Sequence, residues 1–293
     1  MKHAILGAGA IGGLMATALS SLGEDVTLIV RSDKLAEQPL TLTLERPGGT
    51  LTAPAKVAAR VTGSVDVLWI ATKTYQLDAA LELVETTPGT IVPLLNGVDH
   101  IAVLRARFGH DRVVPATIAV EAERSAPGRF VHRTPVRLNV AASGEPLLKE
   151  VIEGLRGLGF ACQFIASEST LLWGKLCFLE PFALVTSASG KNNGEIHTDA
   201  EWKAKLESAV HEACAVATKE SAQVDADKIL AVYPGAPPAM RASMAKDLAA
   251  GRPLELDGIA GPVLRGGARH GVPTPTTASL VATIEAVVQA RTK

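Results

Sequence analysis

Residues 1–23 read MKHAILGAGAIGGLMATALSSLG and admit two interpretations. One basic residue, an apolar run and a small-residue end are typical of a secretory signal peptide. The same letters contain Gly7, Gly9 and Gly12 in the spacing Gly-x-Gly-x-x-Gly, which is typical of a turn that binds a dinucleotide. The residues around the three glycines decide between these interpretations.

The glycines lie between segments with different periodicities. Residues 2–7 are an apolar run of strand type, residues 10–23 carry small and apolar residues at helical spacing, and residues 24–31 predict a second strand. In a strand-turn-helix-strand unit the first glycine allows the tight turn, the second lets the backbone approach a pyrophosphate, and the third lets the helix pack on the sheet. The helix N-terminus then offers N–H groups to the phosphates. This context favours dinucleotide binding over a signal peptide. The candidate cofactor contacts in the turn are Gly7, Ala8, Gly9, Ala10, Ile11 and Gly12.

The end of the second predicted strand indicates which dinucleotide binds. An acidic residue there would accept a hydrogen bond from the ribose 2′-OH of NAD, but this chain has Val30 followed by Arg31. A guanidinium suits the 2′-phosphate of NADP(H) instead. The alternative is an ordinary solvated arginine in a loop. We therefore expect NADP(H) as the cofactor.

Further strand-like runs predict the fold class. They lie at 50–57, 65–73, 89–97 and 112–120, with helical material such as 76–85 between them. Such alternation predicts an α/β domain with a doubly wound, Rossmann-type parallel sheet.

Ligands bind beyond the carboxyl ends of strands in such a sheet, which directs attention to Lys73 and to Asn96-Gly97. Each side chain would lie where it can contact the cofactor or a substrate. An ordinary turn is the alternative for Asn96-Gly97, because that dipeptide favours turns.

Length and composition predict two domains. A chain of 293 residues, 47% of them hydrophobic, can bury two cores. After a last strand at 160–166 the chain is almost wholly helical, with expected helices around 202–221, 239–250, 257–270 and 277–290. We therefore predict a dinucleotide-binding domain at 1–166 and an all-α domain at 167–293.

Charge and cysteine usage favour small-molecule partners. The net charge is −1, with 29 Lys and Arg against 30 Asp and Glu, so no basic field is expected to hold nucleic acid or an anionic membrane. Cys162, Cys177 and Cys214 lack metal-ligand spacing, and the seven histidines are scattered. We expect no metal site, no membrane span and a cytoplasmic protein.

The motifs and their spacing together resemble the ketopantoate reductase (2-dehydropantoate 2-reductase) family over nearly the whole chain. The shared stretches are GAGAIG at 7–12, Arg31, TKTYQ at 72–76, LLNG at 94–97, AERSAPGRFVH at 122–132, WGKL at 173–176, NNGE at 192–195, SMAKD at 243–247, LELDGIAG at 254–261 and ARHGVPTPT at 268–276.

The resemblance implies NADPH-dependent reduction of ketopantoate to pantoate, a step of pantothenate biosynthesis, by a homodimer. It implies that Lys175 is the general acid and that Glu255 lies near the cofactor ribose and the active site. This fits the chemistry, because a hydride that reaches a carbonyl carbon leaves negative charge on oxygen and a donor is needed there. Positions matching the family's further cofactor contacts are Lys73, Asn96, Ala122 and Glu255, and those matching its substrate contacts are Asn96, Lys175, Leu179, Ala183, Asn193 and Ser243.

The chain departs from the family on the substrate side. Asparagines are usual in the family at the positions of Leu179, Ala183 and Thr277, and a threonine at that of Leu254. Lost amide donors weaken specificity for a polar substrate more than they weaken the reduction itself. Two alternatives therefore stay open: a relative that reduces a less polar ketone or an imine, and a non-catalytic NADPH-binding protein that senses redox state or partners another chain.

Overall fold

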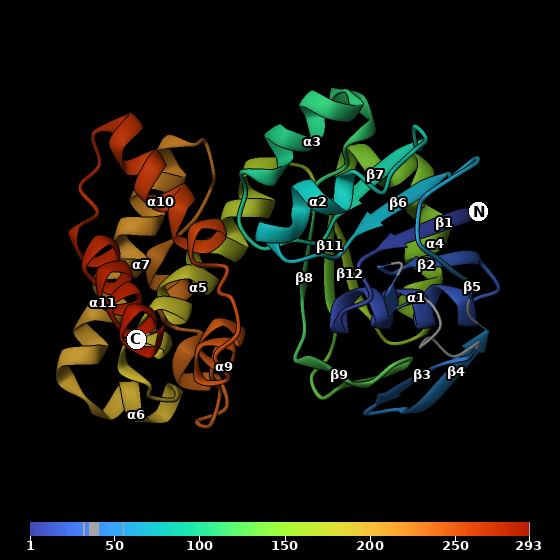
Figure 1. Ribbon diagram of the computed structural model, residues 1–293. Helices are drawn as coiled ribbons and strands as arrows, with labels where there is room; N and C mark the ends of the chain where they lie inside the picture. Colours follow the sequence, from blue (N-terminus) through green and yellow to red (C-terminus); the bar gives the residue numbers. More distant parts are fainter. Residues whose placement is uncertain (32, 35–40, 55, 293) are drawn as a thin grey trace. The chain divides into compact units, whose positions relative to one another are not determined.

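The computed structural model describes residues 1–31, 33–34, 41–54 and 56–292 (Figure 1). The chain divides into two compact units. The N-terminal unit comprises Met1–Leu95 and His100–Leu171, and the helical unit comprises Asn96–Asp99 and Leu172–Lys293. The division therefore falls inside helix α5 (Glu168–Ser189), a few residues after the predicted one at 166. The start of α5 packs with the N-terminal unit, since Leu171 belongs to its core cluster and Glu168 forms an ion pair of 2.7 Å with Arg105.

A five-stranded parallel sheet forms the centre of the N-terminal unit, as the sequence predicts. Its order is β5-β2-β1-β6-β7, and every neighbouring pair is parallel. The strands are β1 (Lys2–Leu6), β2 (Asp25–Ile29), β5 (Lys56–Ala58), β6 (Val67–Ile70) and β7 (Thr90–Pro93). All residues of β6 and β7 are buried, which is the pattern of strands covered on both faces. The opening stretch thus forms β1, the glycine turn and helix α1 (Ala10–Ser21) at the centre of a doubly wound fold.

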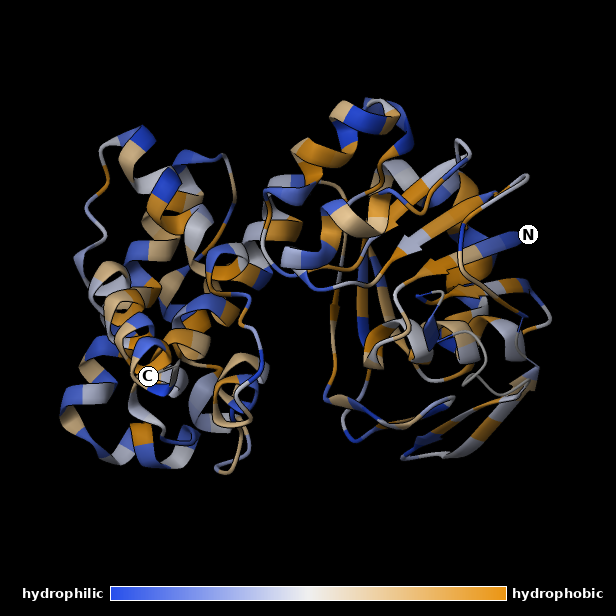
Figure 2. Ribbon diagram, in the orientation of Figure 1, coloured by the Kyte–Doolittle hydropathy of each residue, from blue (hydrophilic) through white to orange (hydrophobic). Residues whose placement is uncertain are grey.

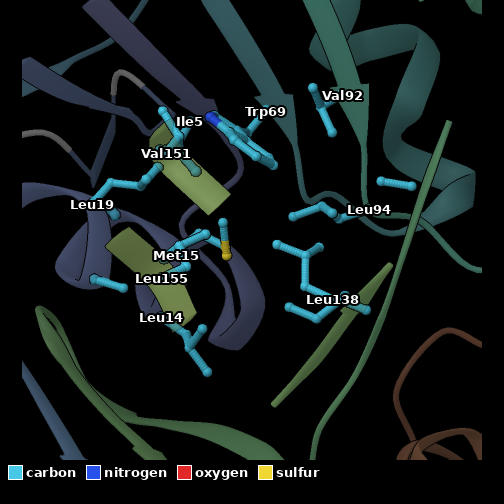
Figure 3. Close-up of a cluster of buried hydrophobic side chains, with 14 of the residues drawn as sticks. Ile5, Leu14, Met15, Leu19, Trp69, Val92, Leu94, Leu138, Val151 and Leu155 are labelled. Atoms are coloured by element: carbon cyan, nitrogen blue, oxygen red, sulfur yellow. The ribbon is translucent and has the colours of Figure 1, made fainter. Parts of the chain in front are cut away.

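The core of this unit lies between one face of the sheet and two helices. Figure 3 shows Leu14, Met15 and Leu19 of α1 in the same cluster as Val151 and Leu155 of α4 (Glu145–Gly157). Each of these five side chains is at most 2% exposed. Truncating one such leucine to alanine costs about 2–5 kcal/mol, so this packing fixes α1 and the turn before it.

Two further sheets complete the N-terminal unit. One has the order β4-β3-β10-β9 and the other β12-β11-β8. The strands are β3 (Thr41–Arg46), β4 (Gly49–Pro54), β8 (Ala116–Ala119), β9 (Ala122–Ala126), β10 (Arg129–His132), β11 (Arg137–Ala141) and β12 (Ala161–Ile165), and the remaining helices of the unit are α2 (Leu77–Leu81) and α3 (His100–Phe108). The expectation of one strand at 50–57 in the parallel sheet is corrected here, because β4 pairs antiparallel with β3 while β5 joins the central sheet. The run at 112–120 forms β8, which pairs antiparallel with β11.

The helical unit follows the prediction of an all-α domain. After α5 it contains α6 (Asn193–Thr198), α7 (Ala200–Lys219), α8 (Ala226–Leu230), α9 (Ser243–Ala249), α10 (Leu256–His270) and α11 (Pro275–Thr292). Apolar and polar residues alternate along these helices in Figure 2, as expected of helices with one buried face. Helix α7 packs against both α10 and α11 and contributes Ala209, Val210 and Ala213 to the core.

Within the described residues, α5 is the one helix long and apolar enough to cross a membrane. However, 67% of its apolar window is buried inside the protein, which is typical of a core helix in a globular domain. The three cysteines are free and buried. No group of three histidine, cysteine, aspartate or glutamate side chains that could hold a metal ion occurs in the described ranges.

Candidate active site

Two of the three glycines in the turn after β1 have no room for a side chain. Gly7 has a φ of +110°, and a Cβ there would lie 2.9 Å from the carbonyl oxygen of Ala71. A Cβ at Gly12 would lie 1.8 Å from the carbonyl oxygen of Gly7. Side chains at these two positions are therefore excluded by the protein itself.

Gly9 differs from the other two glycines. It is exposed, it is the N-cap residue of α1, and a Cβ there would have no heavy atom within 4 Å. The first turn of α1 carries no acidic residue, so the N–H groups at the start of this helix can bind an anion. Backbone donors beside open space fit the pyrophosphate of a dinucleotide.

Three cations lie on the segments around the parallel sheet. Arg31 follows β2, and its side chain is 74% exposed, with Nε 3.5 Å from Oδ1 of Asp33. Lys73 is half-buried and precedes the short 3-10 helix Thr74–Gln76. Arg124, which the sequence analysis missed, donates from Nη1 to the carbonyl oxygen of Ala8 at 3.3 Å and so contacts the glycine turn directly. Its partner is 116 residues away, so no local pattern announces the contact.

Ala122, the remaining predicted cofactor contact, is the half-buried first residue of β9, the strand that carries Arg124.

Lys175, Asn96 and Glu255 come together in the helical unit. Lys175 Nζ donates to Asn96 Oδ1 at 2.9 Å, and Asn96 Nδ2 donates to Glu255 Oε2 at 3.4 Å. Lys175 lies on α5, and Glu255 is the N-cap residue of α10. The second hydrogen bond is long and therefore weak. The amide of Asn96 bridges a cation and a carboxylate that are far apart in the sequence.

Burial changes the acid-base chemistry of this group. Desolvation lowers the pKa of Lys175 to about 8, while the Glu255 carboxylate opposes the shift by favouring the charged ammonium. Glu255 itself is 5% exposed. A lysine with a pKa near 8 is well matched to proton transfer close to neutral pH.

The sequence left open whether Asn96-Gly97 is an ordinary turn or part of a ligand site, and the structure shows features of both. Gly97 has a φ of +79°, as in many turns, and a Cβ there would lie 2.0 Å from the carbonyl oxygen of Gly258. Asn96 at the same time holds Lys175.

The predicted substrate contacts have diverse surroundings. Leu179 is half-buried one helical turn after Lys175, whereas Ala183, one turn further, is 0% exposed and belongs to the core of the helical unit. Asn193 is 3% exposed and donates to the carbonyl oxygens of Tyr233 at 2.8 Å and Ala236 at 3.2 Å.

The remaining positions discussed for substrate binding also differ in their exposure. Ser243 is exposed at the start of α9, Leu254 is half-buried, and Thr277 is 0% exposed with its N–H donated to Glu212 Oε2 at 2.8 Å. The roles predicted for these residues in substrate binding stay predictions.

Comparison with known proteins gives the family. The sequence model described as "Ketopantoate reductase PanE/ApbA" matches residues 3–145, and the one described as "Ketopantoate reductase PanE/ApbA C terminal" matches residues 169–288. A 2-dehydropantoate 2-reductase of Caulobacter vibrioides is 33% identical over 294 residues, with 97% of this chain and 98% of that protein covered.

Two solved structures share the fold. A D-mandelate dehydrogenase in complex with NADH and anilino(oxo)acetate has a TM-score of 0.86 and 23% identity, covering 99% of each chain. A dimeric ketopantoate reductase from Staphylococcus aureus has a TM-score of 0.80 and 23% identity, again covering 99% of each chain. With a Rossmann-type unit, a helical unit and both family models matched in order, this chain belongs to the ketopantoate reductase family, whose members are oxidoreductases that act on a carbonyl or the corresponding alcohol with a nicotinamide cofactor.

Proposed function

We propose that this protein is an NADPH-dependent reductase that transfers a hydride to the carbonyl carbon of a small 2-oxo acid, with ketopantoate as the leading substrate and pantoate as its product. The observation that carries the proposal is the hydrogen bond from Lys175 to Asn96, with Glu255 on the other side of the amide. This arrangement holds one ammonium donor in a partly desolvated position.

Lys175 acts as the general acid. The cofactor, when bound, supplies the hydride, and the carbonyl oxygen then gains negative charge. The Lys175 ammonium donates a proton to that oxygen, Asn96 orients the ammonium by accepting one of its hydrogen bonds, and Glu255 keeps the amine protonated near neutral pH. Each of the three residues thus has a distinct part in delivering one proton.

The N-terminal unit holds the cofactor. The N–H groups at the start of α1, beside the open space at Gly9, would hold the pyrophosphate of the cofactor. Arg31 pairs with the 2′-phosphate, which selects NADPH over NADH, since its guanidinium follows β2 and its side chain is 74% exposed. Lys73, Ala122 and Arg124 are the further contacts.

A second candidate is the reduction of a less polar ketone or of an imine by the same lysine. It is favoured by Leu179, which is half-buried one turn from Lys175 and offers no hydrogen bond to a polar substrate. The mandelate dehydrogenase with this fold supports the idea that the fold serves substrates other than ketopantoate. A non-catalytic NADPH-binding protein is disfavoured, because such a protein has no need of an oriented, desolvated lysine.

We further propose a cytoplasmic homodimer. The dimeric Staphylococcus aureus enzyme of the same fold supports the homodimer. Light scattering on the purified protein should give twice the chain mass, and a monomer at micromolar concentration would count against it.

A substrate and cofactor panel tests the function. Oxidation of NADPH is followed with ketopantoate, aryl 2-oxo acids and apolar ketones, and the product is identified by mass spectrometry. Lys175→Ala should lower kcat by about 10²–10⁴-fold with NADPH affinity retained. Lys203→Ala, which removes an exposed lysine of α7, is the matched control. Absence of turnover on every carbonyl would reject the reductase, and unchanged turnover in Lys175→Ala would reject its general acid.

A further inference from the structure

The segment Asn96–Asp99, called the 96–99 segment below, belongs to a different unit from its neighbours in sequence. Residues before and after it pack within the N-terminal unit, whereas these four residues pack with the helical unit. The segment carries Asn96, the residue that holds Lys175. What fixes the segment therefore also fixes the donor geometry at Lys175.

The middle of the segment is held by close packing on α10. The backbone of Gly97 is so near that of Gly258 that a Cβ would approach the carbonyl oxygen to 2.0 Å. Val98 is half-buried and packs against the core of the helical unit. These contacts bring the segment against the first turn of α10, directly after Glu255.

The end of the segment is held by ion pairs with Arg265. Its Nη2 and Nε donate to Oδ2 of Asp99 at 2.6 Å and 3.2 Å, and its Nη1 donates to Oδ1 of Asp257 at 2.6 Å. A single guanidinium on α10 thus joins the 96–99 segment to the start of the helix that Glu255 caps. The planar fork of arginine suits this double role better than a lysine would.

We propose that Arg265 is a positioning residue, which holds Asp99 and so keeps Asn96 bonded to Lys175 and turned toward Glu255. The proposal rests on the proposed function for the role of Lys175. Within the described ranges, the hydrogen bonds of Arg265 run to Asp99 and Asp257, whereas Lys175 donates to Asn96, so the effect is carried by the 96–99 segment.

The exposure of the Arg265–Asp99 pair and the length of the Asn96–Glu255 hydrogen bond distinguish a positioning role from a general contribution to stability. The side chains of Arg265 and Asp99 are 47% and 49% exposed, and exposed ion pairs contribute little to global stability. The geometry at Asn96 is far more sensitive, because its bond to Glu255 is already at 3.4 Å and a further displacement breaks it. Loss of Arg265 should therefore change the chemistry of Lys175 while leaving the melting temperature almost unchanged.

The pKa of Lys175 gives a readout that needs no substrate. It is measured in the full-length protein by competitive acetylation over a pH series, with peptide mass spectrometry. In Arg265→Ala and in Asp99→Ala the pKa of Lys175 should move by about half a unit or more, upward from about 8, because release of the segment rehydrates the ammonium. Arg269→Ala is the matched control, since it removes an exposed ion pair of the same helix whose partner is Glu220.

Steady-state kinetics with a carbonyl substrate that the protein reduces give the second readout. Each single variant should lower kcat by about tenfold with the dissociation constant of NADPH unchanged, and the double variant of Arg265 and Asp99 should be no slower than either single one. Arg265→Lys should recover part of the rate, because it keeps the charge.

The two readouts separate the possible failures. If no carbonyl is reduced, the proposed function fails while acetylation still tests the positioning. Folded Arg265→Ala and Asp99→Ala proteins in which Lys175 keeps the wild-type pKa would overturn the proposal, and so would equal effects in Arg269→Ala. If Arg265→Ala does not fold, Asp99→Ala alone decides.

Discussion

Gly9 and Gly12 lie in one turn, yet the structure predicts opposite consequences for substituting them. A valine at Gly9 meets no atom of the protein, and the backbone there, at φ −77° and ψ −167°, is extended and suits a β-branched residue. Losing glycine as the N-cap residue costs about 0.5–1 kcal/mol, and a less flexible unfolded chain returns about 0.4–1 kcal/mol. Gly9→Val should therefore change the free energy of unfolding by less than about 1 kcal/mol.

Cofactor binding should respond in the opposite way. If the pyrophosphate lies against the backbone of Gly9, the valine side chain occupies its place, and affinity for NADPH should fall by about 100-fold or more, equivalent to about 2.8 kcal/mol. Gly12→Ala instead forces its Cβ to within 1.8 Å of a carbonyl oxygen and should destabilise the fold by about 1–3 kcal/mol or more.

Thermal melts and fluorescence titration with NADPH, run side by side, distinguish these effects. Gly157→Val, at an exposed glycine of the same unit with no heavy atom within 4 Å of its Cβ position, serves as the control and should change neither property by much. Wild-type affinity for NADPH in a folded Gly9→Val protein would refute the assignment of this turn to the cofactor.

Three further predictions follow from single side chains. Arg31→Ala should weaken NADPH binding by about 1.5–3 kcal/mol and leave NADH binding nearly unchanged in parallel titrations; equal losses would remove Arg31 from cofactor selection. Leu179→Asn should raise kcat/KM on ketopantoate by several-fold, about 0.5–1.5 kcal/mol for one regained hydrogen bond, and should lower kcat/KM on an apolar ketone. Ala183→Asn should mainly lower the melting temperature, because Ala183 is fully buried. Equal kinetic effects of the two substitutions would contradict this prediction. Burial first, and the Glu212 carboxylate second, raise the pKa of Glu180 well above its ordinary value, so the contribution of Glu180 to stability is intact below about pH 4.5 and is lost as pH rises. In denaturant titrations from pH 5 to 9, the unfolding free energy of Glu180→Gln should therefore fall less steeply with pH than that of the wild type, by at most about 1.4 kcal/mol per pH unit. Parallel slopes would contradict this prediction.

The strands and helices that local patterns specify were predictable from the sequence. The apolar runs that became β1, β2, β6 and β7 are bounded by turns and alternate with helices, and this alternation alone indicates a parallel sheet. The pairing of the remaining strands was not predictable. Residues 50–57 look like one strand, but β4 and β5 enter different sheets, because the partner strands are set by tertiary packing rather than by propensity.

The three residues of the Lys175 cluster were named from the sequence, and their roles stay predictions, whereas the residue that supports the cluster was not found. Lys175, Asn96 and Glu255 follow from the family motifs, and their hydrogen bonds bring them together in one unit. Arg265 escaped notice, because an arginine on a helix is usually a solvated surface residue and its partner Asp99 lies 166 residues away. Contacts of that range leave no periodicity in a sequence.

The pH dependence of carbonyl reduction tests the role of Lys175 most directly. The general acid must be protonated, so kcat/KM for the 2-oxo acid at saturating NADPH should be constant at low pH and fall as pH rises through about 8, the pKa to which burial lowers Lys175. The apparent pKa in this profile should match that obtained for Lys175 by competitive acetylation in the complex with NADPH. A rate that stays constant from pH 6 to 10, or that falls with a pKa unrelated to that of Lys175, would contradict proton donation by this residue.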